Sequence, residues 1–137
     1  MAFVIDASCF AAMLLNEEVP EPVRDLLASL PSNEIVVPAL WYWEVGNAAL
    51  MATRRKRIAA AEVHDQLADF RDLTIAVDRT AMDSAWTRTY DLAVRHNLTL
   101  YDAAYLELAI RRGLPLGSLD DALVRAAKAE GVEVIGT

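Results

Sequence analysis

Four acidic side chains stand where a buried strand would end or a helix would begin, and their chemistry is the most informative feature of this chain. Asp6 follows the apolar run Phe3–Ile5, Asp102 opens a helical stretch, and Asp120 follows another short apolar run. Glu44 lies among tryptophan, tyrosine and valine neighbours, where a charged group needs a partner. Acids gathered in one pocket repel, so they must bind a cation or take up protons.

A site built only from carboxylate oxygens prefers a hard divalent cation, Mg²⁺ or Mn²⁺. Zn²⁺ is disfavoured, because Cys9 is the only cysteine and the two histidines, His64 and His96, fall in unrelated helices and are expected to be exposed. Asn47 shares one helical stripe with Glu44, so it belongs beside the same pocket.

The elements that must position these acids alternate between strand and helix. Apolar runs predict about five strands, over Phe3–Ile5, Ile35–Val37, Leu73–Val77, Leu116–Leu119 and Val132–Ile135. The alternation predicts an α/β fold with a mostly parallel sheet in a single domain, residues 1–137. Because the carboxyl ends of parallel strands share one edge, the acids should meet there.

Helical spacing and capping residues predict the connecting helices. We expect Ser8 to cap a helix over Cys9–Leu15, Pro38 to lie in the first turn of the next long helix, and Thr80 to cap a long helix that reaches about His96. The remaining helices are expected over Glu21–Leu30, Ala39–Thr53, Ala59–Arg71, Tyr101–Arg112 and Asp121–Glu130. The helix over Ala39–Thr53 is apolar nearly all round, so it should be buried on more than one side, and another subunit or a partner is a candidate cover for one of them.

Composition limits the possible functions. The chain has 137 residues, 55% of them hydrophobic, and a formal net charge of −7. A protein that holds nucleic acid by charge alone would be basic, so any such role must be local or assisted by a cation. No apolar run is long enough to span a bilayer, the N-terminus does not resemble a signal peptide, and a lone cysteine fits a reducing cytoplasm.

Four stretches, in this order along the chain, resemble the motifs of PIN-domain ribonucleases, and most of all the VapC-type toxins of bacterial toxin–antitoxin pairs. They are Phe3–Ser8, Val37–Leu50, Leu100–Ala109 and Leu116–Asp120. The resemblance implies a PIN-like α/β/α sandwich. It carries Asp6, Glu44, Asp102 and Asp120 over as the catalytic acids, with Ser8 and Ser118 beside them. Gly117-Ser118 departs mildly from the threonine that the family often has, and Asp121 lies one position past the matching acid.

With that resemblance, we expect metal-dependent hydrolysis of RNA by an activated water. Asp6 and Asp102 would be the main ligands of Mg²⁺ or Mn²⁺, Asp120 would complete the site directly or through water, and Glu44 would orient water or hold a second ion. The resemblance also implies a homodimer and a cognate antitoxin that covers the site.

Three other functions fit an acidic α/β pocket less well. A phospho-acceptor signalling domain would usually need a lysine near the final strands, and residues 113–119 have none. A phosphatase with a DxD nucleophile lacks its second acid, because the strand reads Asp6-Ala7-Ser8. A PIN-like module that binds RNA or protein without cleaving stays open. The cations Arg54–Arg57 are either a solvated helix end or a contact to the RNA backbone.

Overall fold

A computed structural model describes residues 1–29 and 32–136 of the chain. The described residues form a four-stranded sheet in the order β3-β2-β1-β4, in which every neighbouring pair is parallel. The strands are β1 (Ala2–Ile5), β2 (Glu34–Pro38), β3 (Ile75–Asp78) and β4 (Leu116–Gly117). The predicted α/β fold with a parallel sheet is confirmed.

The fifth predicted strand, Val132–Ile135, is wrong. Val134 makes a single isolated parallel bridge to Leu116, so the chain touches the sheet edge without forming a strand there. Its partner β4 is only two residues long, because the chain turns at Ser118 toward the end of β1. A two-residue strand offers too few backbone groups to pair a longer neighbour.

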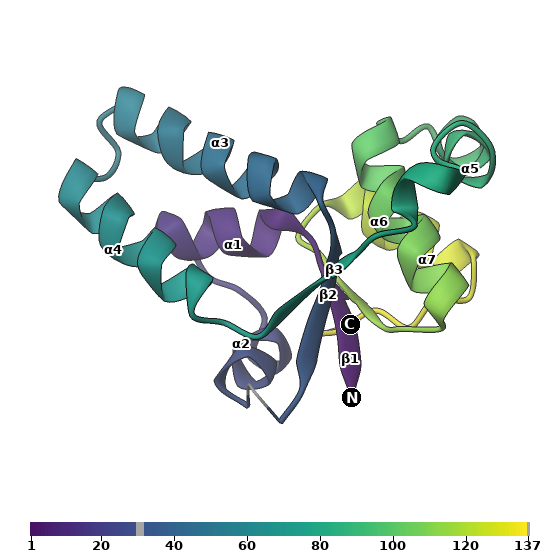
Figure 1. The fold of residues 1–137 in the computed structure, drawn as a ribbon, viewed down its shortest axis with the longest axis horizontal. Helices are drawn as coiled ribbons and strands as arrows, with labels where there is room; N and C mark the ends of the chain where they lie inside the picture. The colour runs from purple at the N-terminus through teal and green to yellow at the C-terminus, as the bar shows by residue number, and fades with distance from the viewer. Residues whose placement is uncertain (30–31, 137) are drawn as a thin grey trace.

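The helices cover both faces of the sheet. In Figure 1, α1, α3 and α4 lie on one side of the strands and α5, α6 and α7 on the other. The helices are α1 (Ala7–Leu14), α2 (Glu21–Ala28), α3 (Leu40–Arg54), α4 (Ala60–Arg71), α5 (Arg88–His96), α6 (Leu100–Arg112) and α7 (Asp121–Ala129), and η1 (Ala81–Ser84) is a short 3₁₀ helix.

The core forms where apolar strands meet apolar helix faces. Val4 and Ile5 of β1 are fully buried, as are Ile35, Val36 and Val37 of β2, which fits strands covered on both faces. On the α1 side, the Phe10 ring packs edge-on against Trp41 at 4.9 Å and against Phe70 at 5.1 Å between centroids. These rings tie α1, α3 and α4 together.

Three predicted helix starts differ from the structure. The first helix begins at Ala7, and Asp6 rather than Ser8 caps it, because the Asp6 carboxylate accepts from the Ser8 N–H. Pro38 ends β2 instead of opening α3. The helix that contains Asp102 begins at Leu100, since the Thr99 hydroxyl accepts from the Asp102 N–H at 3.1 Å.

The single long helix predicted from Thr80 to His96 is also wrong. The chain instead forms η1 and then α5, with an irregular Thr87 (φ −122°, ψ −99°) between them. Tertiary contacts support this break: Arg88 donates to the Ser84 hydroxyl at 2.7 Å and lies 3.4 Å from the Glu107 carboxylate on α6.

Other boundaries differ by a few residues. The second helix ends at Ala28, and the predicted end at Leu30 lies outside the described residues. Within the described part of the chain, no helix is both long and apolar enough to cross a membrane.

Candidate active site

Asp6 is the most constrained acid of the site. It leaves the sheet directly after β1, and only 3% of its surface is exposed. Its Oδ1 accepts from the Ser8 N–H at 3.1 Å and from the Ser8 hydroxyl, and its Oδ2 accepts from the Ser118 hydroxyl at 2.6 Å. Both carboxylate oxygens are therefore held in place by neutral donors.

The two serines also join the ends of β1 and β4. The Ser8 hydroxyl accepts from the Leu119 N–H at 2.8 Å, and the Ser118 hydroxyl accepts from the Asp120 N–H at 3.0 Å. Each hydroxyl thus links a carboxylate oxygen of Asp6 to a backbone N–H beyond β4. The structure places both predicted serines in contact with Asp6.

Gly117 lies in β4 just before this link and packs closely against β1. A Cβ added at Gly117 would lie 2.8 Å from the Ile5 Cδ1 atom in the core of β1. A larger residue here would force the buried Ile5 side chain to shift, and glycine avoids this where β4 lies against β1 and Ser118 reaches Asp6.

Burial raises the pKa of Asp6 to about 6, and the neighbouring charge of Asp102 acts in the same direction. The hydrogen bonds from Ser118 and Ser8 oppose this increase, because they favour the charged carboxylate. Asp6 is therefore close to half protonated near pH 6 when no cation is bound.

Glu44 lies on α3 and is held by a residue that the sequence did not single out. The Tyr105 hydroxyl donates to the Glu44 Oε1 at 2.7 Å. Burial raises the pKa of Glu44, the Tyr105 bond lowers it, and the charges of Asp102 and Asp6 raise it further. Tyr105 lies three residues after Asp102, on the same inward face of α6. This spacing is the sequence feature that could have identified Tyr105 as a residue of the site.

Asp102 and Asp120 complete the acidic group from the starts of two helices. Burial and the charge of Asp120 raise the pKa of the half-buried Asp102. Asp120 is exposed and caps α7 by accepting from the Leu123 N–H at 2.9 Å, as its N-cap pattern predicts. Asp121 is an exposed residue of the first turn.

The four acids therefore share one neighbourhood at the carboxyl edge of the sheet. The charge of Asp102 raises the pKa of Asp6, both of these charges raise the pKa of Glu44, and the charge of Asp120 raises the pKa of Asp102. None of the four forms an ion pair with a lysine, arginine or histidine among the described residues. Mutual repulsion without a protein cation is what a hard divalent ion would relieve.

The carboxylates of the described residues do not converge on one point. Over residues 1–29 and 32–136, no three side chains of histidine, cysteine, aspartate or glutamate are grouped closely enough to hold a metal ion. Asp6 is fixed by its serines, so closing such a site would require movement of the more exposed acids, Asp102 and Asp120.

Other predicted site residues lie further out. Asn47 is exposed on α3, and its side chain makes no hydrogen bond in the described part of the chain. His64 is exposed as predicted, but His96 is half-buried and lies 3.0 Å from the Glu130 carboxylate. The cations from Arg54 to Arg57 begin about 15 Å along α3 from Glu44, at the far end of the helix in Figure 1.

An ion-pair network connects α6 to the end of β3. The Arg111 guanidinium lies 2.7 Å from the Asp78 carboxylate and 2.8 Å from the Glu107 carboxylate, and the Glu107 side chain is only 3% exposed. These bonds hold the pKa of Asp78 below its usual range. The network connects β3 to α6 and thereby fixes the helix that carries Asp102 and Tyr105.

Comparison with known proteins matches this arrangement to one family. The model of the PIN domain matches residues 3–129. Ribonuclease VapC3 of Pyrobaculum aerophilum is 29% identical over 88% of this chain and 90% of its own length. Ribonuclease VapC9 of Mycobacterium tuberculosis is 33% identical over 77% of this chain and 76% of its own. A member of the VapBC family of toxin–antitoxin systems, VapBC-5 from M. tuberculosis, shares the fold, with a TM-score of 0.62, 20% identity and coverage of 99% and 98%.

Proposed function

Since this chain belongs to the PIN-domain family, and within it to the VapC ribonucleases, we propose that it is a metal-dependent endoribonuclease and the toxin component of a toxin–antitoxin pair. The observation that carries the proposal is the acidic group itself. Asp6, Glu44 and Asp102 are coupled by charge, Asp102 is also coupled to Asp120, and no cation of the described residues forms an ion pair with any of the four.

Asp6 and Asp102 are the proposed main ligands of Mg²⁺ or Mn²⁺, with Asp120 contributing directly or through water. A bound ion of this kind would lower the pKa of a coordinated water and stabilise charge on the phosphate oxygens. The all-oxygen donor set supports a hard cation. The buried Cys9 is a poor alternative ligand, because burial raises its thiol pKa to about 12 and keeps it protonated.

The protein's own residues supply orientation. Ser8 and Ser118 hold both oxygens of Asp6, so this carboxylate needs no rearrangement to present its remaining lone pairs. Tyr105 fixes one oxygen of Glu44, so the other oxygen would be free to orient the attacking water or to hold a second ion. The raised pKa of Glu44 moves this carboxylate toward the range in which a general base is effective.

A cognate antitoxin and a second copy of the chain are the proposed protein partners. One solved relative of the same fold is described as a member of a toxin–antitoxin system. Several large apolar side chains are exposed, among them Trp43 at 80% and Trp86 at 88%. Side chains of this kind support protein–protein contact, and size measurements in solution would establish whether the free protein is a homodimer.

Cleavage of RNA by the purified protein tests the proposed reaction. Structured RNAs are incubated with Mg²⁺, Mn²⁺ or EDTA, and the wild type is compared with Asp6→Asn and Asp102→Asn. Asp65→Asn is the matched control, because Asp65 is an exposed acid on α4, away from the site. We expect cleavage by the wild type and the control with either metal, and none with EDTA or with either site variant.

Two outcomes contradict the proposal. Cleavage that survives EDTA or either site substitution would show that the acids are wrongly assigned. Failure of the wild type to cut any RNA would favour a non-cleaving PIN-like module that binds RNA or protein. Added Asp121→Asn data would show whether the second acid of the Asp120-Asp121 pair takes part.

A further inference from the structure

A groove of about 420 Å³ lies beside the acidic group, over the ends of β2 and β3. The start of α3, the η1 turn and the start of α6 form its walls. Its lining is largely apolar and includes Leu40, Val77, Arg79, Met82, Ala85 and Tyr101. A cavity of this size falls in the range of sites that hold small organic groups.

The groove and the acidic group lie on the same edge of the sheet. Tyr101 directly precedes Asp102 on α6, and Leu40 lies one helical turn before Glu44 on α3. The crevice outside the carboxyl ends of parallel strands is where α/β proteins bind their ligands. A polymer whose phosphate lies at the acids would therefore place its neighbouring unit at the groove.

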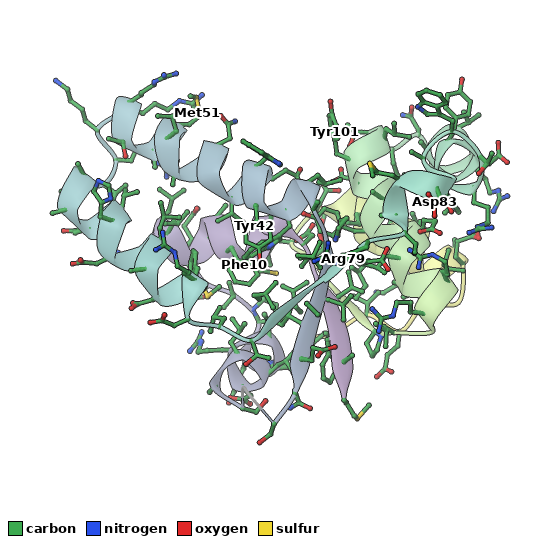
Figure 2. All side chains as sticks on the ribbon, in the orientation of Figure 1. Phe10, Tyr42, Met51, Arg79, Asp83 and Tyr101 are labelled. Carbon is green, nitrogen blue, oxygen red and sulfur yellow. The ribbon has the colours of Figure 1, made fainter. Side chains whose placement is uncertain are left out.

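The exposed groups of the groove suit a nucleotide. Tyr101 is 63% exposed and offers an aromatic surface, and Met82, exposed by 83%, adds a flexible apolar one. Arg79 is exposed and forms no ion pair with any described residue, whereas its neighbour Asp78 is neutralised by Arg111. Figure 2 shows Tyr101 at the start of α6 and Arg79 just after β3.

We propose that this groove is a nucleotide-binding subsite, in which a base of the RNA stacks on Tyr101 and the adjoining phosphate contacts Arg79. The inference rests on the proposed function, since it places the nucleotide next to the bond that is cut. An aromatic platform beside a free cation is the combination by which proteins bind single-stranded nucleic acid. The net charge of the protein is −7, so most of its surface repels the RNA backbone. A local cation such as Arg79 would attract a phosphate at this one position.

Binding is measured on the full chain in an Asp6→Asn background, which should leave the RNA uncut. The probe is a fluorescein-labelled single-stranded RNA of random sequence, followed by anisotropy with Mg²⁺ at several salt concentrations. Tyr101→Leu should weaken binding by about 5- to 150-fold without changing the salt dependence, and Tyr101→Phe should restore it. Arg79→Gln should weaken binding and lower the magnitude of the salt slope by about 0.7.

Arg125→Gln is the matched control, because Arg125 is an exposed cation on α7 that forms no ion pair with a described residue. It should bind RNA as the background does. In otherwise wild-type protein, Tyr101→Leu should also reduce the cleavage rate at subsaturating RNA while Tyr101→Phe does not.

The results separate this inference from the proposed function. If the wild type cuts RNA in the presence of metal but Tyr101→Leu and Arg79→Gln bind as tightly as the background, the subsite alone is overturned. If the wild type neither binds nor cuts RNA, both proposals are overturned. If Tyr101→Leu changes the oligomeric state in sedimentation runs together with affinity, the groove is a subunit contact and the subsite is overturned.

Discussion

Neutralising Asp6 should make the metal-free protein more stable at neutral pH. The Asp6 carboxyl is 3% exposed, and burial raises its pKa to about 6 in the folded protein, against 3.8 for an ordinary aspartate. The folded state therefore binds the proton more tightly than the unfolded state does. Such a group adds its full contribution to the free energy of unfolding below the pKa of the unfolded state. This contribution is lost as pH rises through the pKa of the folded state.

The size of the effect follows from that difference. A gap of about two pKa units corresponds to about 3 kcal/mol, all of it lost by about pH 7 to 8. Asp6→Asn removes this cost but replaces an acceptor of the Ser118 hydrogen bond with an amide N–H, which costs about 1 kcal/mol. The net expectation is a gain of about 2 kcal/mol at pH 8 and a loss of up to about 1 kcal/mol at pH 4, where only the hydrogen-bond cost remains.

Urea unfolding in EDTA, repeated between pH 4 and pH 8, measures the difference in the free energy of unfolding between the wild type and Asp6→Asn. The free energy of unfolding of the wild type should fall as pH rises, and the raised pKa values of Glu44 and Asp102 should add to the decline. The Asp6→Asn curve should decline less. Mg²⁺ should then stabilise the wild type at pH 8 and have less effect on the variant. Parallel pH curves for the two proteins would refute the assignment of a buried, destabilising charge at Asp6.

Three further substitutions test the supports of the site. Ser118→Ala should destabilise the protein by about 1–3 kcal/mol in urea unfolding and raise the Asp6 pKa, which would be seen as a shift of the stability profile to higher pH. Tyr105→Phe removes the 2.7 Å bond to Glu44, so it should weaken Mg²⁺ binding in calorimetry by up to about 10- to 100-fold with little loss of fold. Gly117→Ala should cost about 1–3 kcal/mol, because its Cβ meets the core at 2.8 Å.

Controls for these variants are present in the same chain. Gly46→Ala places a Cβ on α3 with nothing within 4 Å, so it should stabilise the protein by up to about 1 kcal/mol. Tyr42→Phe changes a half-exposed tyrosine and should leave Mg²⁺ affinity unchanged. A Gly117→Ala protein as stable as the Gly46→Ala protein would show that β4 and β1 are not as closely packed as described. Mg²⁺ affinity unaffected by Tyr105→Phe would remove Tyr105 from the support of the site.

The sequence predicted the layout of this fold because its signals are local. Apolar runs such as Val4–Ile5 and Ile35–Val37 can be read as buried strands from composition alone, and they are fully buried. The position of Asp6 at the end of such a run predicted the edge at which the acids gather, and their mutual effects on pKa agree with this.

Features that depend on contacts between distant segments could not be predicted in this way. The break between η1 and α5 contains neither proline nor glycine, and it is accompanied by a contact from Arg88 to Glu107 on another helix. The hydrogen bond from Tyr105 to Glu44 spans 61 positions. The missing fifth strand reflects the short β4, which ends where the chain turns at Ser118 toward Asp6, 112 positions away. Local propensity carries no information on any of these.

The tethering of Asp6 by two serine hydroxyls has a consequence for ion choice. A carboxylate that is hydrogen-bonded at both oxygens loses little conformational entropy when an ion binds. The same bonds restrict its rotation, so it adapts poorly to an ion with longer coordination distances. Ca²⁺ takes more ligands at longer range than Mg²⁺ and relies on pliable donors. The two serines would thus favour Mg²⁺ over the larger Ca²⁺, because they fix the position of the Asp6 carboxylate before an ion binds.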